Sequence, residues 1–249
     1  IIFINNKILT FRKAMGIVLG ANIGTTISSQ LFALNVGVLS LSLLLLGIGV
    51  SLLYRKKKNR TLGKIILLFS LLFGGIYLME HAVEPLRLNP YFSQLLLKET
   101  NSPISAAIVG AFLTLIMQSS SATVAMTIVF AKNGLLSAYN SIAIMIGAEL
   151  GTCSDTLIAT IRGSRQAIKT GLFHLSFNLA SIFLGLLFFD PFVQLVVWFG
   201  QNAAIQNTIA NAHLIFNAGG VLLFIWTIPL FEKGLNYLLP EKKDPLVNY

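Results

Sequence analysis

Long apolar segments alternate with short polar or basic segments along most of the chain. Two of the apolar segments, 36–54 and 62–79, are separated only by residues 55–61, which contain the basic run RKKKNR at 55–60. Each has close to the roughly 20 apolar residues that an α-helix needs to cross the hydrocarbon core of a bilayer. The pattern therefore predicts a helical hairpin in a membrane.

Polar residues interrupt a longer apolar segment further along the chain. Segment 104–131 is too long for one ordinary span and contains QSSS at 118–121, which predicts two helices with a break between them. The connection 80–103 is polar and punctuated by prolines, which predicts a loop. Three other segments have the length of a single span: 138–161, 170–189 and 209–231. The expected fold class is an all-α, polytopic membrane bundle.

Composition agrees with this fold class. The chain is 55% hydrophobic and 11% charged, whereas about a quarter of the residues in a soluble domain are charged. Cys153 is the one cysteine, which excludes an intramolecular disulfide. Near the start of the chain, Asn5, Asn6 and Lys7 interrupt the apolar core that a cleavable signal peptide would need.

The net charge of +9 is clustered, and the clusters predict an orientation. Cytoplasmic loops of membrane proteins carry an excess of Lys and Arg. Placing 55–60 in the cytoplasm also places the basic turn 162–169 and the C-terminal lysines inside, and it leaves 80–103 outside. We therefore expect a multi-pass protein of the plasma membrane that contacts the lipid bilayer and not nucleic acid, with the basic clusters serving as an orientation signal.

An internal repeat relates two polar interruptions. GANIGTT at 20–26 recurs in altered form as GAELGTC at 147–153, and the residues before the two motifs align at the same offset without a gap. Duplicated, glycine-containing interruptions are typical of transporters built from inverted repeats. We expect broken helices at both copies, because non-helical backbone in a membrane is tolerated only around a cavity.

The polar interruptions have residue types that suit ions. A broken helix presents amides to an anion at one end, while carbonyl and hydroxyl oxygens suit a small hard cation such as sodium. QSSSAT at 118–123 supplies one side-chain amide and four hydroxyls. Small hydroxylated residues also pack membrane helices closely, but three interruptions, two of them repeat-related, favour a ligand site.

Four motifs in order resemble the bacterial sodium–phosphate cotransporters of the type II family. They are GANIGTT (20–26), QSSSATVAM (118–126), RQAIKTGLFHLSFN (165–178) and IANAHLIFN (209–217). The resemblance runs from Phe11 to about Leu239. It implies two inverted repeats, each with a QSSS hairpin and a GANIGTT segment, with phosphate and sodium bound between the QSSS motifs. It also implies a homodimer.

The resemblance assigns Gln118, Ser119–Ser121, Asn22, Thr25 and Thr26 to the site, and the residue types around the same motifs add Thr123, Glu149 and Thr152. Those expected to bind phosphate are Gln118, Ser119, Ser120, Ser121 and Thr123. Those expected to bind sodium are Asn22, Thr25, Thr26, Ser120, Glu149 and Thr152. The chain is then a sodium-coupled secondary transporter of inorganic phosphate in the bacterial inner membrane, not an enzyme, with Na⁺ as coupling ion and no other cofactor.

The chain departs from the family pattern in two ways. The repeat partner of 118–121 would lie before Ile1, so we expect another QSSS tetrad upstream of this sequence. The second repeat has Glu149 in place of Asn22 and Asp155 in place of Ser28. Either acid is a candidate for ion coupling, as part of a sodium site or as a proton carrier.

Other interpretations stay open at this point. Within transport they are a different oxyanion or proton coupling through Glu149. Outside it they are a membrane enzyme acting on lipid phosphates and an interaction partner of a phosphate-signalling protein. The repeated FHLSFN and AHLIFN patterns predict packing and hydrogen-bonding roles for His174 and His213, with Asn178 and Asn217 beside them. EHAVE at 80–84 is expected to be a solvated helix end and not a metal site.

The expected division of the chain has four parts. They are the C-terminal part of the first repeat (1–61), a linking span with an external loop (62–102), the second repeat (103–190), and a last span with a short cytoplasmic tail (191–249).

Overall fold

A computed structural model describes residues 2–6, 8–34, 36–53, 57–161 and 163–240, and every regular element in them is a helix. The α-helices are α1 (Ile2–Asn5), α2 (Phe11–Phe32), α3 (Ser40–Leu53), α4 (Lys57–Arg87), α5 (Pro90–Glu99), α6 (Pro103–Met117), α7 (Ser120–Lys132), α8 (Ala138–Thr160), α9 (Arg165–Leu187), α10 (Phe189–Phe199), α11 (Ile205–Phe224) and α12 (Ile228–Leu238). Two short 3₁₀ helices, η1 (Gly37–Leu39) and η2 (Ile225–Thr227), precede α3 and α12.

The membrane fold predicted from the sequence is confirmed. Four helices in the described ranges are long and apolar enough to cross a bilayer, or five if the bent pair α5–α6 is counted as one broken span. Large apolar side chains such as Leu53, Leu222 and Trp226 are exposed on the outer faces of the helices. Such surfaces are stable in lipid and not in water. The chain is therefore a multi-pass membrane protein.

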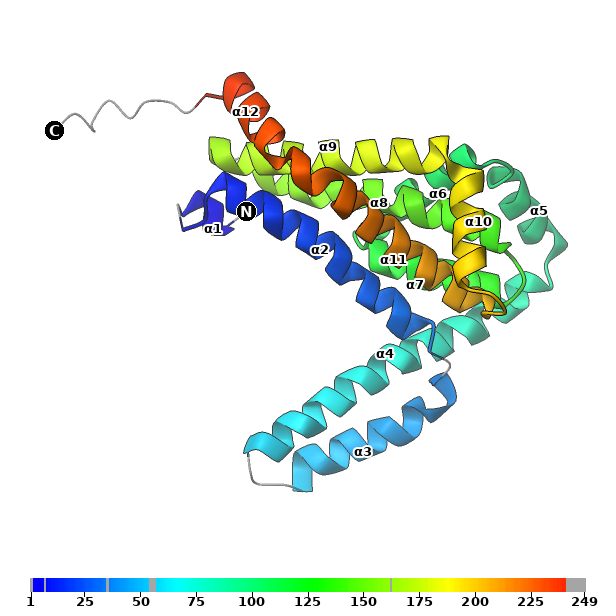
Figure 1. The fold of residues 1–249 in the computed structure, drawn as a ribbon. Helices are drawn as coiled ribbons and strands as arrows, with labels where there is room; N and C mark the ends of the chain where they lie inside the picture. Colours follow the sequence, from blue (N-terminus) through cyan, green and yellow to red (C-terminus); the bar gives the residue numbers. More distant parts are fainter. Residues whose placement is uncertain (1, 7, 35, 54–56, 162, 241–249) are drawn as a thin grey trace.

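The predicted hairpin at 36–79 is also confirmed, as α3 and α4 (Figure 1). The two helices cross closely at glycines. A methyl group on Gly47 would lie 2.7 Å from the amide nitrogen of Leu67, and one on Gly63 would lie 2.5 Å from Ser51 Oγ. The small residues thus allow backbone contact, as in many membrane helix pairs.

The prediction of a loop at 80–103 is wrong. Helix α4 continues through Pro85 to Arg87, and α5 occupies most of the remainder. A new helix begins here because the Asn89 side chain accepts hydrogen bonds from the amides of Tyr91 and Phe92. Pro90 takes the first helical position, where its missing N–H costs nothing.

The break predicted at QSSS is confirmed. Gln118 has a left-handed backbone conformation (φ 52°) between α6 and α7. Ser119 is the N-cap of α7, and its hydroxyl accepts a hydrogen bond from the amide of Ala122. A residue with positive φ ends a helix, and the capping serine begins the next one.

The prediction of broken helices at 20–26 and 147–153 is wrong, because α2 and α8 run through both motifs. The hydroxyls of Thr25 and Thr152 donate to carbonyls of their own helix, Asn22 O and Ala148 O. The glycines of α8 instead allow close packing against α6. A methyl group on Gly147 would lie 1.8 Å from the carbonyl oxygen of Ala107 in α6.

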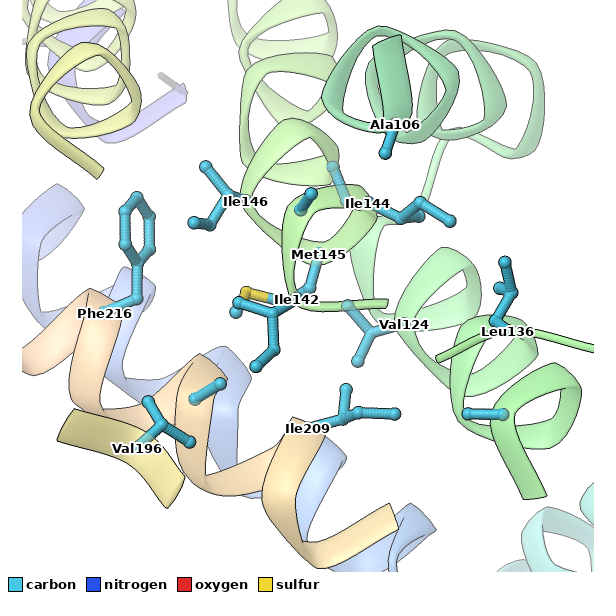
Figure 2. Close-up of a cluster of buried hydrophobic side chains, with 14 of the residues drawn as sticks. Ala106, Val124, Leu136, Ile142, Ile144, Met145, Ile146, Val196, Ile209 and Phe216 are labelled. Carbon is cyan, nitrogen blue, oxygen red and sulfur yellow. The ribbon is translucent and has the colours of Figure 1, made fainter. Parts of the chain in front are cut away.

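Helix α8 lies at the centre of the main apolar core. Its residues Ile142, Met145 and Ile146 have no exposed surface and pack with Val124 of α7 and Ile209 of α11 (Figure 2). Neighbouring helices therefore surround the helix that carries GAELGTC. This arrangement explains how α8 can hold polar side chains away from lipid.

Figure 1 shows where the helix ends near the basic segments lie. The starts of α4 and α9 and the end of α12 lie toward its left side, and α5 lies toward its right. This placement agrees with 57–60 and 165–169, the parts of the two basic segments that begin α4 and α9, sharing one face. Which face is cytoplasmic stays a prediction.

Candidate substrate and ion site

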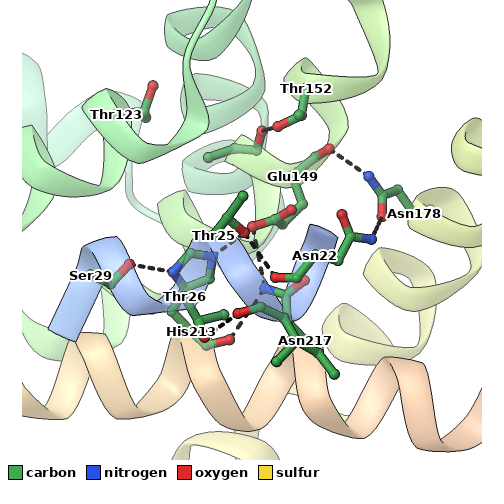
Figure 3. Close-up of polar contacts among 12 residues, drawn as sticks. Asn22, Thr25, Thr26, Ser29, Thr123, Glu149, Thr152, Asn178, His213 and Asn217 are labelled. Carbon is green, nitrogen blue, oxygen red and sulfur yellow. Dashed lines mark hydrogen bonds and ion pairs between the residues drawn. The ribbon is translucent and has the colours of Figure 1, made fainter. Parts of the chain in front are cut away.

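A buried polar cluster surrounds Glu149 at the middle of α8. Glu149 is 2% exposed, and its Oε1 lies 2.7 Å from Nε2 of His213, which has no exposed surface (Figure 3). The amide of Asn217 donates to the same carboxylate oxygen at 3.3 Å. The other ring nitrogen of His213 contacts the hydroxyl of Ser29. These partners offset part of the cost of removing a carboxylate from water.

Asn178 of α9 joins the two repeat motifs. Its amide donates to the backbone oxygen of Glu149 at 3.0 Å, and its side-chain oxygen accepts from the amide of Asn22 at 3.2 Å. Asn22 is itself 4% exposed. The repeat-related residues Asn22 and Glu149 therefore lie in one buried cluster, contributed by α2 and α8 (Figure 3).

Two pairs of contacts in this cluster involve repeat-related residues of α2 and α8. Ser29 and Thr156 occupy equivalent positions, since they are related by the same offset as the two motifs. Ser29 contacts His213 Nδ1, and Thr156 contacts His174 Nδ1 at 2.9 Å. Both contacts join a hydroxyl of a motif helix to the histidine of the helix beside it.

The second pair of contacts has the same relation. Asn22 bonds to Asn178, and its repeat equivalent Glu149 bonds to Asn217. If α2 is exchanged with α8 and α9 with α11, the Ser29–His213 contact becomes the Thr156–His174 contact. The same exchange turns Asn22–Asn178 into Glu149–Asn217. The offset of the two motifs relates α2 to α8, and the separate His and Asn pattern relates α9 to α11. The inverted repeat stays a prediction.

The predicted sodium residues on α2 and α8 lie along this cluster, whereas Ser120 lies at the start of α7. Asn22, Thr26 and Glu149 are buried. Thr25 and Thr152 are partly buried, and the hydroxyls of Thr25 and Thr26 donate to Asn22 O and Ile23 O. A hydroxyl that donates its proton keeps its oxygen lone pairs for a cation. The side chain of Asp155, the other coupling candidate, lies outside the described part of the chain.

The predicted phosphate residues lie at the break between α6 and α7. Gln118 is exposed, Ser119 and Ser121 are partly buried, and Ser120 is buried. Thr123 has no exposed surface and hydrogen bonds with Thr114 of α6 at 2.9 Å, so its hydroxyl faces the partner helix of the hairpin. This position is separate from the cluster around Glu149 (Figure 3).

The hairpin nevertheless packs directly on the second repeat motif. A methyl group on Gly151 would lie 2.4 Å from Cβ of Thr114. Thr114 stands four residues before Gln118, one helical turn from the break. Helix α6 therefore contacts α8 at Gly151, between Glu149 and the next turn of α8, one helical turn before α6 ends at the break.

Comparison with known proteins identifies the family. The family model described as Na⁺/Pi-cotransporter matches residues 1–81 and 86–228. The chain belongs to this family. The resemblance found in the four sequence motifs is thereby confirmed.

Two relatives show the range of similarity. The "Uncharacterized protein YqeW" of Bacillus subtilis is 26% identical over 240 residues, which cover 96% of this chain and 77% of that protein. The "Putative inorganic phosphate export protein YjbB" of Escherichia coli K12 is 25% identical over 194 residues, 78% of this chain and 35% of that protein. No solved structure matches the chain at a significant level.

The sequence interpretation missed the place of His213 in the site. Structural hydrogen bonds of both histidines were predicted and are found, but the bond between His213 and Glu149 was not expected. The available signal was the repeated pattern in which His and Asn stand four residues apart, at 174 and 178 and at 213 and 217. That spacing places both polar side chains on one face of a helix.

Removing the hydroxyl of Ser29 should destabilise the protein more than removing that of Thr156. Ser29→Ala leaves a ring nitrogen of the fully buried His213 without its partner, which costs about 1–3 kcal/mol. Thr156 is only partly buried and His174 is 7% exposed, so the ring nitrogen that Thr156→Val leaves without this partner is less completely enclosed by protein. Thermal unfolding of both variants in detergent measures the difference, and equal losses would contradict the account.

Proposed function

We propose that this chain acts in sodium-coupled transport of inorganic phosphate across the bacterial inner membrane by alternating access. One observation carries the proposal: the repeat-related residues Asn22 and Glu149 share a buried polar cluster, and Thr114, one helical turn before the QSSS break, packs on Gly151 of the helix that carries Glu149. Family membership supports phosphate as the substrate.

Phosphate is assigned to the break between α6 and α7. The first amides of α7 have no carbonyl partners within their own helix, and the helix dipole favours an anion there. The hydroxyls of Ser120 and Ser121 and the amide of Gln118 add further hydrogen-bond donors. Gln118 is the exposed member of this group.

Sodium is assigned to the oxygen atoms near Glu149. The cluster supplies one carboxylate, the side-chain oxygen of Asn22 and the hydroxyls of Thr25, Thr26 and Thr152. Sodium bound there would offset the repulsion between phosphate and Glu149. The coupling then has an electrostatic origin, since each ion makes the site more favourable for the other.

The alternative function is hydrolysis of a lipid phosphate, because Ser29, His213 and Glu149 are hydrogen bonded in the order of a hydroxyl–imidazole–carboxylate triad. A nucleophile must reach its substrate, and Ser29 has no exposed surface. We therefore assign these contacts to holding α2, α8 and α11 together. Phosphate release from phosphatidic acid vesicles, lost in Ser29→Ala, would overturn that assignment.

Flux of radiolabelled phosphate in proteoliposomes tests the proposed function. The full-length protein should accumulate phosphate when a sodium gradient is imposed, and a potassium gradient of equal size should have no effect. Flux driven by a pH gradient and unchanged by sodium would instead assign proton coupling. A protein that carries another oxyanion and excludes phosphate would refute the substrate.

A further inference from the structure

A polar cavity of about 290 Å³ lies where α2 and α9 begin and α12 passes. It is far from the central cluster, since Lys169 stands nine residues before Asn178 on α9, about 13.5 Å along the helix axis. Its polar lining consists of Thr10, Arg12, Gln166, Lys169, Glu232 and Asn236. None of these residues belongs to the phosphate or sodium assignment above.

The buried lysine is the informative member of this lining. Lys169 is 2% exposed, and its ammonium donates to the side-chain oxygen of Asn236 at 2.6 Å. An ammonium carries three N–H donors, and lysine is almost never fully buried without a charged partner. Across the described residues no carboxylate lies within 4.0 Å of this ammonium.

The nearest acid in the cavity has a different partner. Glu232 pairs with Arg12 at 3.8 Å, and both side chains are partly or largely exposed. Such a pair contributes little and rearranges easily. The cavity thus contains two cations and one carboxylate, and the cation at its buried side has hydrogen-bond capacity that a small oxyanion would satisfy.

We propose that this cavity binds a phosphate-bearing anion where the helices end. Its Lys169 would contact the phosphate oxygens from the buried side, and Arg12 would contact them from the exposed side through charge-assisted hydrogen bonds. The N-terminal ends of α2 and α9 add a favourable dipole. Inorganic phosphate and the headgroup of an anionic phospholipid share this chemistry. The inference does not depend on sodium-coupled transport.

Three single-charge variants of the full-length protein test this site. In lipid-free neutral detergent at constant ionic strength, inorganic phosphate is titrated while the thermal unfolding midpoint is recorded. Lys169→Gln should raise the apparent Kd for phosphate, read from the rise in the unfolding midpoint, by at least about tenfold. Glu232→Gln should lower that Kd. Lys13→Gln, which removes an exposed cation at the start of α2, should leave it unchanged.

A second arm identifies a lipid ligand. Nanodiscs of phosphatidylcholine with or without phosphatidylglycerol are analysed by native mass spectrometry, and Lys169→Gln should lose one retained phosphatidylglycerol if the headgroup is the occupant. The proposal is overturned if neither arm responds to Lys169→Gln, or if Lys13→Gln has the same effect. If Lys169→Gln does not fold, two other variants test the proposal: Arg12→Gln should raise the apparent Kd for phosphate and Glu232→Gln should lower it. Failure of the proposed function appears separately, as absent sodium-driven flux.

Discussion

Glu149→Gln is expected to lower sodium-driven phosphate uptake by about tenfold or more and to leave the protein folded. Glutamine retains an oxygen that can accept from His213 and Asn217, so the hydrogen-bonded frame of the cluster survives. The variant lacks the full negative charge that would bind a cation. Bonds to charged groups contribute about 1.5–3 kcal/mol, and each 1.4 kcal/mol is about a factor of ten in affinity.

The matched control is Glu80→Gln. Glu80 is a partly buried acid paired with Lys132 between α4 and α7, away from the cluster. This variant should transport phosphate with the sodium dependence of the parent protein. Uptake is measured in proteoliposomes across a range of sodium concentrations. Normal transport by Glu149→Gln, with unchanged sodium dependence, would show that the acid only lines the cluster.

Gly147→Ala is expected to have the largest effect on stability. Its methyl group would lie 1.8 Å from the backbone oxygen of Ala107. Gly110 of α6 makes the reverse contact, since a methyl there would lie 2.0 Å from the backbone oxygen of Ile144. A backbone oxygen cannot rotate away as a side chain can, so α6 and α8 must separate. We expect a loss of about 3 kcal/mol or more.

The internal repeat provides the control for this variant. Gly20 is the residue that corresponds to Gly147, and a methyl group on Gly20 would meet nothing within 4 Å. Gly20→Ala should therefore be neutral or stabilising by about 0.5–1 kcal/mol, as for alanine in place of glycine within a helix. The unfolding midpoint and the monodisperse fraction in detergent compare the two. Equal behaviour would refute the close α6–α8 contact.

The sequence predicted the spans because apolar length is a local property. The α3–α4 hairpin and the break at Gln118 follow from runs of residues whose preferences act over one or two turns. Whether the helix breaks or continues at GANIGTT and GAELGTC is not decided by local sequence. Glycine permits both a break and a close contact, and the choice at Gly147 depends on the carbonyl of Ala107, which belongs to a different helix and is distant in the sequence.

The candidate site was predictable in part for the same reason. The repeat indicated that Asn22 and Glu149 are equivalent, and the structure places them in one cluster. The pairing of His213 with Glu149 depends on how α11 docks against α8, 64 residues apart in sequence. No local pattern encodes that docking, although the repeated His and Asn pairs marked the helix faces involved.

The most direct test of sodium–phosphate coupling is equilibrium binding of radiolabelled phosphate to the purified full-length protein. Binding is measured in sodium chloride and in potassium chloride at equal ionic strength, and sodium binding is then measured with and without phosphate. We predict an apparent phosphate Kd at least about tenfold lower in sodium, with phosphate tightening sodium binding by the same factor, as linkage requires. Identical phosphate binding in the two salts would contradict the coupling.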